Sequence, residues 1–161
     1  MISVTRLNHA VLFVSEFDRT VEFYQKTFGF EVIASTPGQA AFLRASGSQN
    51  HHDLGLFASR SGAPRAPRGS PGLYHLAWEV STIEELARAR EKLSAVGALF
   101  GESDHGATKS LYGHDPDGNE FEVMWLVPRE DWGEHEHSAI IERLDLDDEL
   151  ARYGTPRGYD D

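Results

Sequence analysis

One segment occurs twice in this chain, first as Leu7-Asn8-His9-Ala10-Val11-Leu12-Phe13-Val14-Ser15 and, 66 residues later, as Leu73-Tyr74-His75-Leu76-Ala77-Trp78-Glu79-Val80-Ser81. A His, a Val and a Ser occupy the same positions in both copies. Short apolar runs of this kind are typical of β-strands, in which alternate side chains face opposite sides of a sheet. The repeat is too long for a solenoid unit, so it indicates a duplicated module.

Each copy is followed by a helical pattern and then by three further strand-like segments. The first helical pattern ends at Gly29, while the second has Ser81 and Glu84 at capping-box spacing and ends at Gly97. The later strands are expected at residues 30–34, 40–45 and 53–58 in the first half, and 98–100, 110–113 and 120–126 in the second. The predicted fold class is therefore α+β, with two βαβββ modules forming a curved, cleft-bearing mixed sheet.

The chain of 161 residues is expected to contain one domain followed by a tail. The predicted parts are a domain over residues 1–127, with module one over about 5–58, a Ser-, Gly-, Pro- and Arg-rich linker over 59–71 and module two over about 72–127, and an acidic C-terminal tail over 128–161. The tail is predicted to be partly helical, with one short amphipathic candidate over residues 140–150.

Composition excludes several classes of function. The net charge of −11 argues against nucleic acid and acidic membrane surfaces as partners. Because the chain has no cysteine, a disulfide, a thiolate site and an iron–sulfur cluster are excluded. No apolar stretch is long enough to span a bilayer, and we expect a cytoplasmic protein.

His9, His75 and Glu122 are the candidate metal ligands. Two imidazoles and one carboxylate form the set that holds Fe(II) on one face and leaves the opposite positions open. Glu120 is the alternative carboxylate, because it shares a strand face with Glu122. We prefer Glu122, since apolar residues flank it and a buried carboxylate is costly unless it is paired or bound to metal. Glu120 lies nearer the turn and is expected to be solvated.

Two stretches carry a resemblance to a known family. They are His105-Gly106-Ala107-Thr108-Lys109-Ser110-Leu111-Tyr112-Gly113-His114-Asp115-Pro116-Asp117-Gly118-Asn119-Glu120-Phe121-Glu122 and His51-His52-Asp53-Leu54-Gly55-Leu56-Phe57. With them the chain resembles the vicinal oxygen chelate (glyoxalase/bleomycin resistance/dioxygenase) superfamily, and within it the single-domain type I extradiol dioxygenases. The Asp-Pro-x-Gly turn alone is weak, since these residues are common turn formers. The combined spacing of His105, Tyr112 and Glu122 is more specific.

The resemblance implies an extradiol ring-cleavage dioxygenase that acts on a small aromatic substrate of the catechol type with O2. Fe(II), with Mn(II) as the alternative, would be held by His9, His75 and Glu122. His52 would be the catalytic base, with His51 as the alternative, because adjacent strand residues point in opposite directions. The resemblance also implies a homodimer.

Tyr112 and His105 complete the implied catalytic set. Tyr112 would hydrogen-bond the substrate or its oxygenated intermediate, and His105 would do the same from behind the metal ligands or from the cleft rim. The bland interpretation of each remains open: Tyr112 as a core tyrosine with a solvated hydroxyl, and His105 as a solvent-facing residue of a Gly-rich loop.

Other members of the superfamily remain alternatives. A glyoxalase-like isomerase would need a Glu in each module, and the position matching Glu122 in module one is about Leu56, in a strand without Glu. The fosfomycin-modifying thiol transferases share the two-His, one-Glu set and stay open. A drug-binding resistance protein would lack the metal ligands altogether.

Overall fold

The computed structural model describes residues 1–60, 64, 67, 69–138 and 140–155, and it divides the chain into two compact units. The first unit comprises Met1–Pro71 and Asp115–Gly118, and the second comprises Gly72–His114 and Asn119–Asp161. The predicted linker over residues 59–71 lies partly outside the described residues. In the described part of the chain, no helix combines the length and the apolar character needed to cross a membrane.

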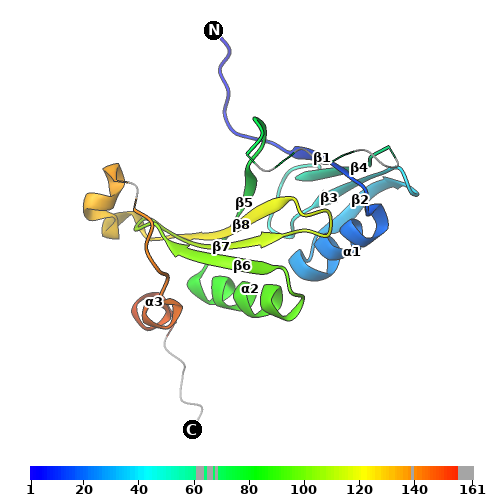
Figure 1. Cartoon of the computed structure of the whole chain (residues 1–161). Coiled ribbons are helices and arrows are strands. Elements are labelled where there is room, and N and C mark those ends of the chain that lie inside the picture. Colours follow the sequence, from blue (N-terminus) through cyan, green and yellow to red (C-terminus); the bar gives the residue numbers. More distant parts are fainter. Residues whose placement is uncertain (61–63, 65–66, 68, 139, 156–161) are drawn as a thin grey trace. The chain divides into compact units, whose positions relative to one another are not determined.

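The first unit is a four-stranded sheet with one helix against it (Figure 1). Its elements are β1 (Ala10–Val14), α1 (Phe17–Phe28), β2 (Glu31–Thr36), β3 (Ala40–Arg44) and β4 (Leu54–Ala58). The strand order is β1-β4-β3-β2, with β1 parallel to β4 and the other pairs antiparallel. Helix α1 ends at Gly29, whose φ of 71° is left-handed and favours glycine.

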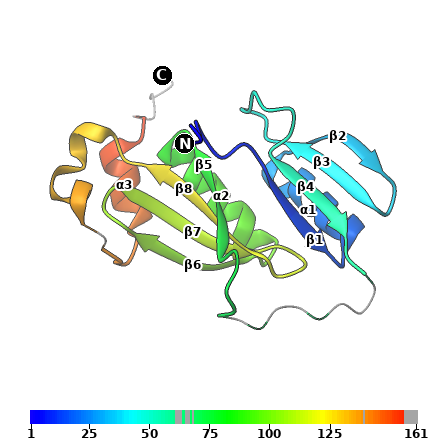
Figure 2. The same ribbon diagram turned by 90° about the horizontal axis from the view of Figure 1, so that it is seen from above.

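The second unit repeats this arrangement and adds the C-terminal segment (Figure 2). Its elements are β5 (His75–Val80), α2 (Ile83–Ala95), β6 (Leu99–Asp104), β7 (Thr108–His114), β8 (Glu120–Leu126), the 3-10 helices η1 (Arg129–Asp131) and η2 (Gly133–His137), and α3 (Leu146–Tyr153). The order β5-β8-β7-β6 matches that of the first sheet. This match confirms the predicted α+β class and the duplicated strand, helix, three-strand order.

Several element boundaries differ from the prediction. Strand β1 begins at Ala10, so His9 lies immediately before the strand rather than within it. The helix cap is Thr82, whose side chain accepts a hydrogen bond from the backbone N of Glu85 at 3.2 Å, and not the predicted Ser81–Glu84 box. The tail helix is α3, which begins after most of the predicted 140–150 segment. Local sequence signals locate such ends only to within a few residues.

Side-chain alternation places the core between each sheet and its helix. In β8, Phe121, Val123 and Trp125 are buried, while Glu120 and Glu122 between them face the other side. The buried residues of α2 supply the apolar surface on which that side of the second sheet packs. The polar strand residues are thereby left on the face away from the helix.

The turn Asp115–Gly118 belongs to the first unit, although it joins β7 and β8 of the second. Asp117 Oδ1 accepts hydrogen bonds from the backbone N and the Oγ of Ser15, both at 2.5 Å. Its Oδ2 accepts from Thr20 Oγ1 at 2.7 Å. Asp117 thus satisfies donors at the N-terminal end of α1, where Glu16 has no capping side-chain bond of its own.

Acidification is expected to remove the stabilising effect of Asp117. Burial alone would raise the pKa of Asp117, but hydrogen bonds from Ser15, Thr20 and Glu16 outweigh it and hold the pKa below its usual value. The contribution is therefore present above the unfolded pKa of about 3.9 and is lost as pH falls through the lower folded pKa. We expect Asp117→Asn to lower the free energy of unfolding at pH 7 by about 1–2 kcal/mol.

The measurement is urea denaturation of both proteins at several pH values. The difference between wild type and Asp117→Asn should shrink below about pH 4. The control is Asp18→Asn, an equal charge change at an exposed position in the first turn of α1, which should have a much smaller effect. Equal losses at pH 3 and pH 7 would contradict the assignment.

Two strand glycines provide a matched test of packing in the second sheet. A Cβ added at Gly113 would lie 2.4 Å from Phe121 Cζ and 3.1 Å from the Ala98 carbonyl, whereas at Gly101 the nearest atom would be 3.8 Å away. Because the Phe121 ring is buried, it cannot move without cost. We expect Gly113→Ala to lower the free energy of unfolding by about 1–3 kcal/mol. Gly101→Ala should leave thermal unfolding nearly unchanged, and equal effects would show that the Phe121 pocket is pliable.

Candidate active site

His9 and His52 lie together in the first unit. Their ring centroids are 4.4 Å apart, and the His52 ring also contacts Phe42 at 5.0 Å. His52 is half-buried, while the neighbouring His51 is exposed, with 3.1 Å between the two Nδ1 atoms. Of the two candidate bases, His52 is thus the one beside His9.

Burial is the main influence on the pKa of His52. It lowers the pKa of the His52 imidazole, and the nearby His9 and His51 lower the pKa further, while Asp53 opposes them. The neutral imidazole is therefore favoured, and only this form can accept a proton.

The loop that carries His52 is tied by Asp53. This carboxylate accepts hydrogen bonds from the Ala45 backbone N at 2.9 Å, from Ser48 Oγ at 2.7 Å and from Asn50 Nδ2 at 2.7 Å. Burial alone would raise the pKa of Asp53, yet these bonds outweigh it and hold the pKa below its usual value. The loop conformation is accordingly fixed by an ionised group at its end.

Asn8 and Asn50 orient the His9 ring. Asn8 Oδ1 lies 2.9 Å from His9 Nδ1, and Asn8 Nδ2 donates to Asn50 Oδ1 at 3.1 Å. Since an amide oxygen only accepts, His9 Nδ1 is the donor and Nε2 remains available as a ligand. This arrangement could not be predicted from the sequence, because Asn50 is 42 residues from Asn8.

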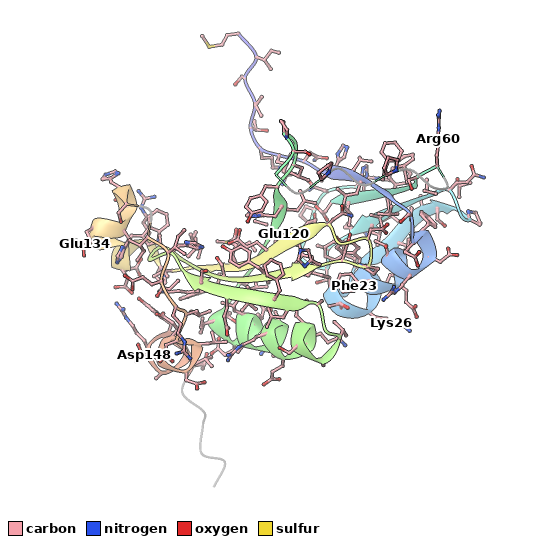
Figure 3. The ribbon with its side chains drawn as sticks, in the orientation of Figure 1. Phe23, Lys26, Arg60, Glu120, Glu134 and Asp148 are labelled. Carbon is pink, nitrogen blue, oxygen red and sulfur yellow. The ribbon has the colours of Figure 1, made fainter. Side chains whose placement is uncertain are left out.

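His75 and Glu122 meet on the open face of the second sheet. His75 Nε2 lies 3.1 Å from Glu122 Oε2, and His75 Nδ1 lies 3.9 Å from Glu120 Oε1. The two Glu side chains are similarly buried, with 9% of Glu120 and 12% of Glu122 exposed. The expectation that Glu120 is solvated is therefore wrong. Glu120 lies at the start of β8, on the side of the sheet away from α2 (Figure 3).

The His75–Glu122 pair fits a metal ion. Two ligands bound at about 2.1 Å and at right angles lie about 3.0 Å apart, close to the separation of these two atoms. The pair supplies one imidazole and one carboxylate, as the two-His, one-carboxylate set requires. Among the described residues, no three His, Asp or Glu side chains are grouped closely enough to hold a metal. The structure thus brings two of the three predicted ligands together, and His9 lies in the other unit.

His105 and Tyr112 form a hydrogen-bonded pair on the second sheet. His105 Nε2 lies 2.7 Å from the Tyr112 hydroxyl, and His105 Nδ1 lies 2.8 Å from the Ile140 carbonyl. Both side chains are partly buried, and the Tyr112 ring centroid is 6.0 Å from that of His75. Burial, followed by the Glu122 carboxylate, raises the pKa of Tyr112, so the phenol stays protonated. Both nitrogens of His105 are thus engaged rather than facing solvent, and the Tyr112 hydroxyl is bonded to one of them.

The position in the first sheet that matches Glu122 carries no candidate metal ligand. Glu122 of β8 pairs with Ala77 of β5, and the equivalent pair in the first sheet is Val11 with Gly55. The counterpart of Glu122 is therefore Gly55, one residue before the predicted Leu56. Leu56 faces the core and is fully buried, so it could not have been the counterpart of a residue on the open face.

The chain belongs to the Glyoxalase/Bleomycin resistance protein/Dioxygenase superfamily, whose model matches residues 6–123. It is similar to the Catechol-2,3-dioxygenase of Bacillus subtilis, with 34% identity over 128 residues that cover 80% of this chain and 44% of that protein. It is also similar to the Biphenyl-2,3-diol 1,2-dioxygenase 2 of Rhodococcus globerulus, with 30% identity over 126 residues covering 77% of this chain and 64% of that one.

A solved structure shares the fold. The fosfomycin resistance protein FosX from Listeria monocytogenes, complexed with Mn(II) and sulfate, matches with a TM-score of 0.62 and 23% identity. The match covers 84% of this chain and all of that one. These two sequence relatives are dioxygenases, whereas this structural neighbour is a resistance protein of the same fold.

Proposed function

We propose that this chain is a metal-dependent extradiol ring-cleavage dioxygenase that opens a catechol-type ring with O2. The observation that carries the proposal is the His75–Glu122 pair at 3.1 Å on the same sheet as the His105–Tyr112 pair at 2.7 Å. The similarity to two dioxygenases of aromatic diols supports it. The chain spans less than half of the length of the Bacillus relative, so substrate and assembly are also part of the proposal.

Fe(II), with Mn(II) as the alternative, would be held by His75 and Glu122 of the second unit together with His9 of the first. When bound, such an ion supplies Lewis-acid chemistry that lowers the pKa of a coordinated substrate hydroxyl, and it offers open positions for two ligands. Asn8 holds the His9 ring with Nε2 free, which prepares that nitrogen for coordination.

His52 would accept the proton that the substrate hydroxyl loses. Its depressed pKa keeps the ring neutral near neutral pH, and its contact with the His9 ring places it beside a proposed ligand. Tyr112 would hydrogen-bond the substrate, and His105 would hold the Tyr112 hydroxyl in place. A homodimer and a cytoplasmic location remain predictions.

The alternative is a metalloenzyme of the same superfamily that does not use O2, such as an isomerase or a thiol transferase. The fold shared with FosX, whose structure contains Mn(II), favours it. Its reaction would not depend on air or need the His105–Tyr112 pair. Anaerobic turnover of a non-aromatic substrate would select this alternative.

The two neighbouring carboxylates should differ in their effect on metal binding. Glu122 Oε2 lies 3.1 Å from His75 Nε2. The Glu120 carboxylate is farther from its neighbouring histidines, at 3.9 Å from His75 Nδ1 and 3.8 Å from His114 Nε2. We expect Glu122→Gln to weaken Fe(II) or Mn(II) binding by more than about 100-fold, and Glu120→Gln by about 10-fold at most. Calorimetric titration under anaerobic conditions measures both. A greater loss from Glu120→Gln would make Glu120 the ligand.

Activity is tested with anaerobically Fe(II)-loaded protein and a panel of small catechols, with the reaction started by air. We expect oxygen uptake and a yellow ring-opened product from the wild type. Turnover should fall by about 100-fold or more in His52→Ala, because the base is lost. The control is His137→Ala, which removes an exposed His of η2. No oxygen uptake with any catechol, despite one bound metal per chain, would rule the dioxygenase out.

A further inference from the structure

The C-terminal segment, residues 128–138 and 140–155, packs on the hairpin turn that carries His105. Asp104 and Glu142 exchange two backbone hydrogen bonds, each 2.9 Å long, so the segment pairs with the end of β6. A Cβ at Gly106 would lie 2.4 Å from His135 Cγ, which shows how closely η2 approaches the turn. The C-terminal segment therefore contacts the turn at two places.

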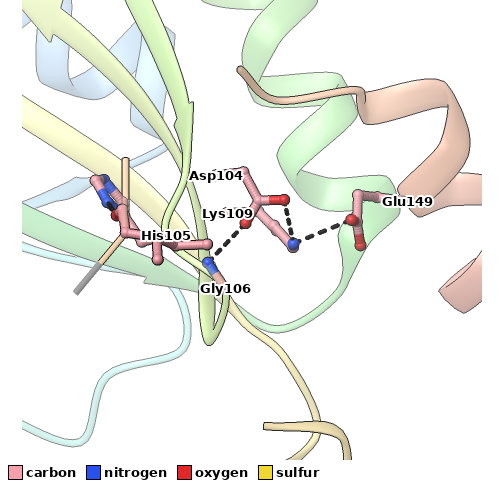
Figure 4. A network of polar contacts seen from close by, with 6 residues as sticks. Asp104, His105, Gly106, Lys109 and Glu149 are labelled. Atoms are coloured by element: carbon pink, nitrogen blue, oxygen red, sulfur yellow. Dashed lines mark hydrogen bonds and ion pairs between the residues drawn. The ribbon is translucent and has the colours of Figure 1, made fainter. Parts of the chain in front are cut away.

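Lys109 adds a third, ionic attachment (Figure 4). Its Nζ lies 2.6 Å from Asp104 Oδ2 and 3.0 Å from Glu149 Oε1 of α3, and the residue is 6% exposed. Asp104 Oδ1 also accepts from the Gly106 backbone N at 2.7 Å. A buried ammonium needs anionic partners, so Lys109 fixes α3 relative to the turn.

Apolar contacts also attach the C-terminal segment to the second sheet, since Leu144 and Leu146 are buried and the Tyr153 ring lies 5.1 Å from that of Trp125. The ion pairs of Lys109 therefore have a role beyond attachment. Buried ion pairs add little net stability because desolvation opposes the attraction, and their best-attested role is to specify one arrangement. The arrangement specified here is the position of the turn relative to residues 140–142.

That position determines where the His105 proton resides. A carbonyl can only accept, so the 2.8 Å contact with Ile140 requires a proton on His105 Nδ1. In the neutral ring Nε2 is then an acceptor, and its 2.7 Å contact requires the Tyr112 hydroxyl to donate. The Tyr112 oxygen can then accept a hydrogen bond from another donor.

We propose that the C-terminal segment is a positioning element of the active site. Through the Ile140 carbonyl it sets the tautomer of His105, and through His105 it makes Tyr112 a hydrogen-bond acceptor toward a substrate hydroxyl. Lys109 and Glu149 are the positioning residues that hold the carbonyl in place. The part about substrate rests on the proposed function, whereas the part about the tautomer does not.

The test is nitrogen NMR of the full chain labelled with ¹⁵N-histidine, with the His105 signals assigned by comparison with His105→Gln. In the wild type, the shifts should show protonated Nδ1 and unprotonated Nε2. Glu149→Gln and Lys109→Met should shift His105 toward a mixture of tautomers. In the catechol assay, the same variants should lower kcat about 10-fold and change KM little.

Asp148→Asn is the matched control, since it makes an equal charge change at an exposed residue of α3 (Figure 3). It should alter neither the shifts nor kcat. If Lys109→Met does not fold, Glu149→Gln decides alone. A wild-type His105 protonated at Nε2, or an unchanged tautomer in the variants, would overturn the proposal. Because the shifts need no turnover, they decide the positioning role even where the catechol assay fails.

Discussion

A strand offers its side chains only two faces, and in each half of this chain a helix covers one of them. In β8 the consequence is strict, because Phe121, Val123 and Trp125 are buried and Glu120 and Glu122 must face the other way. A slip of one residue in the pairing with β5 would exchange the two sets and bury both carboxylates. The polar chemistry of the second sheet therefore depends on the same register that forms its core.

The repeat and the alternation of side chains were sufficient to predict the module order and the face that carries Glu122. Both are local properties, because a strand pattern of seven residues already defines which side chains share a face. The start of β1 after His9 and the burial of Glu120 were not predictable in this way. They depend on pairing with β4 and on the surroundings of β8, which a single segment does not encode.

Contacts between distant segments could also not be predicted from the sequence. Asp117 looked like an ordinary turn residue, yet it bonds Ser15 and Thr20, about 100 residues earlier. Likewise, the acidic tail predicted only a partly helical segment, whereas its Ile140 carbonyl contacts His105. Backbone carbonyls carry no sequence signature, so such a role emerges only from the fold.

The histidines of the two sheets differ in how their second nitrogen is used. His9 and His105 each have Nδ1 engaged by a neighbouring oxygen, which fixes the ring. His75 Nδ1 is buried and has no hydrogen-bond partner among the described residues, and it lies 3.9 Å from Glu120 Oε1. Among its two nitrogens, only Nε2 of His75 therefore has a close polar contact in the described residues, the one with Glu122.

Gly55 makes the two repeated modules chemically different at one equivalent position. The positions of Gly55 and Glu122 are equivalent in the two sheets, but only the second carries a carboxylate. A side chain at Gly55 would place its Cβ 3.2 Å from Val11 Cγ2, so Val11 would have to give way as well. A symmetrical pair of acids would therefore require coordinated changes in two strands, and no single mutation in the first sheet would supply it without displacing Val11.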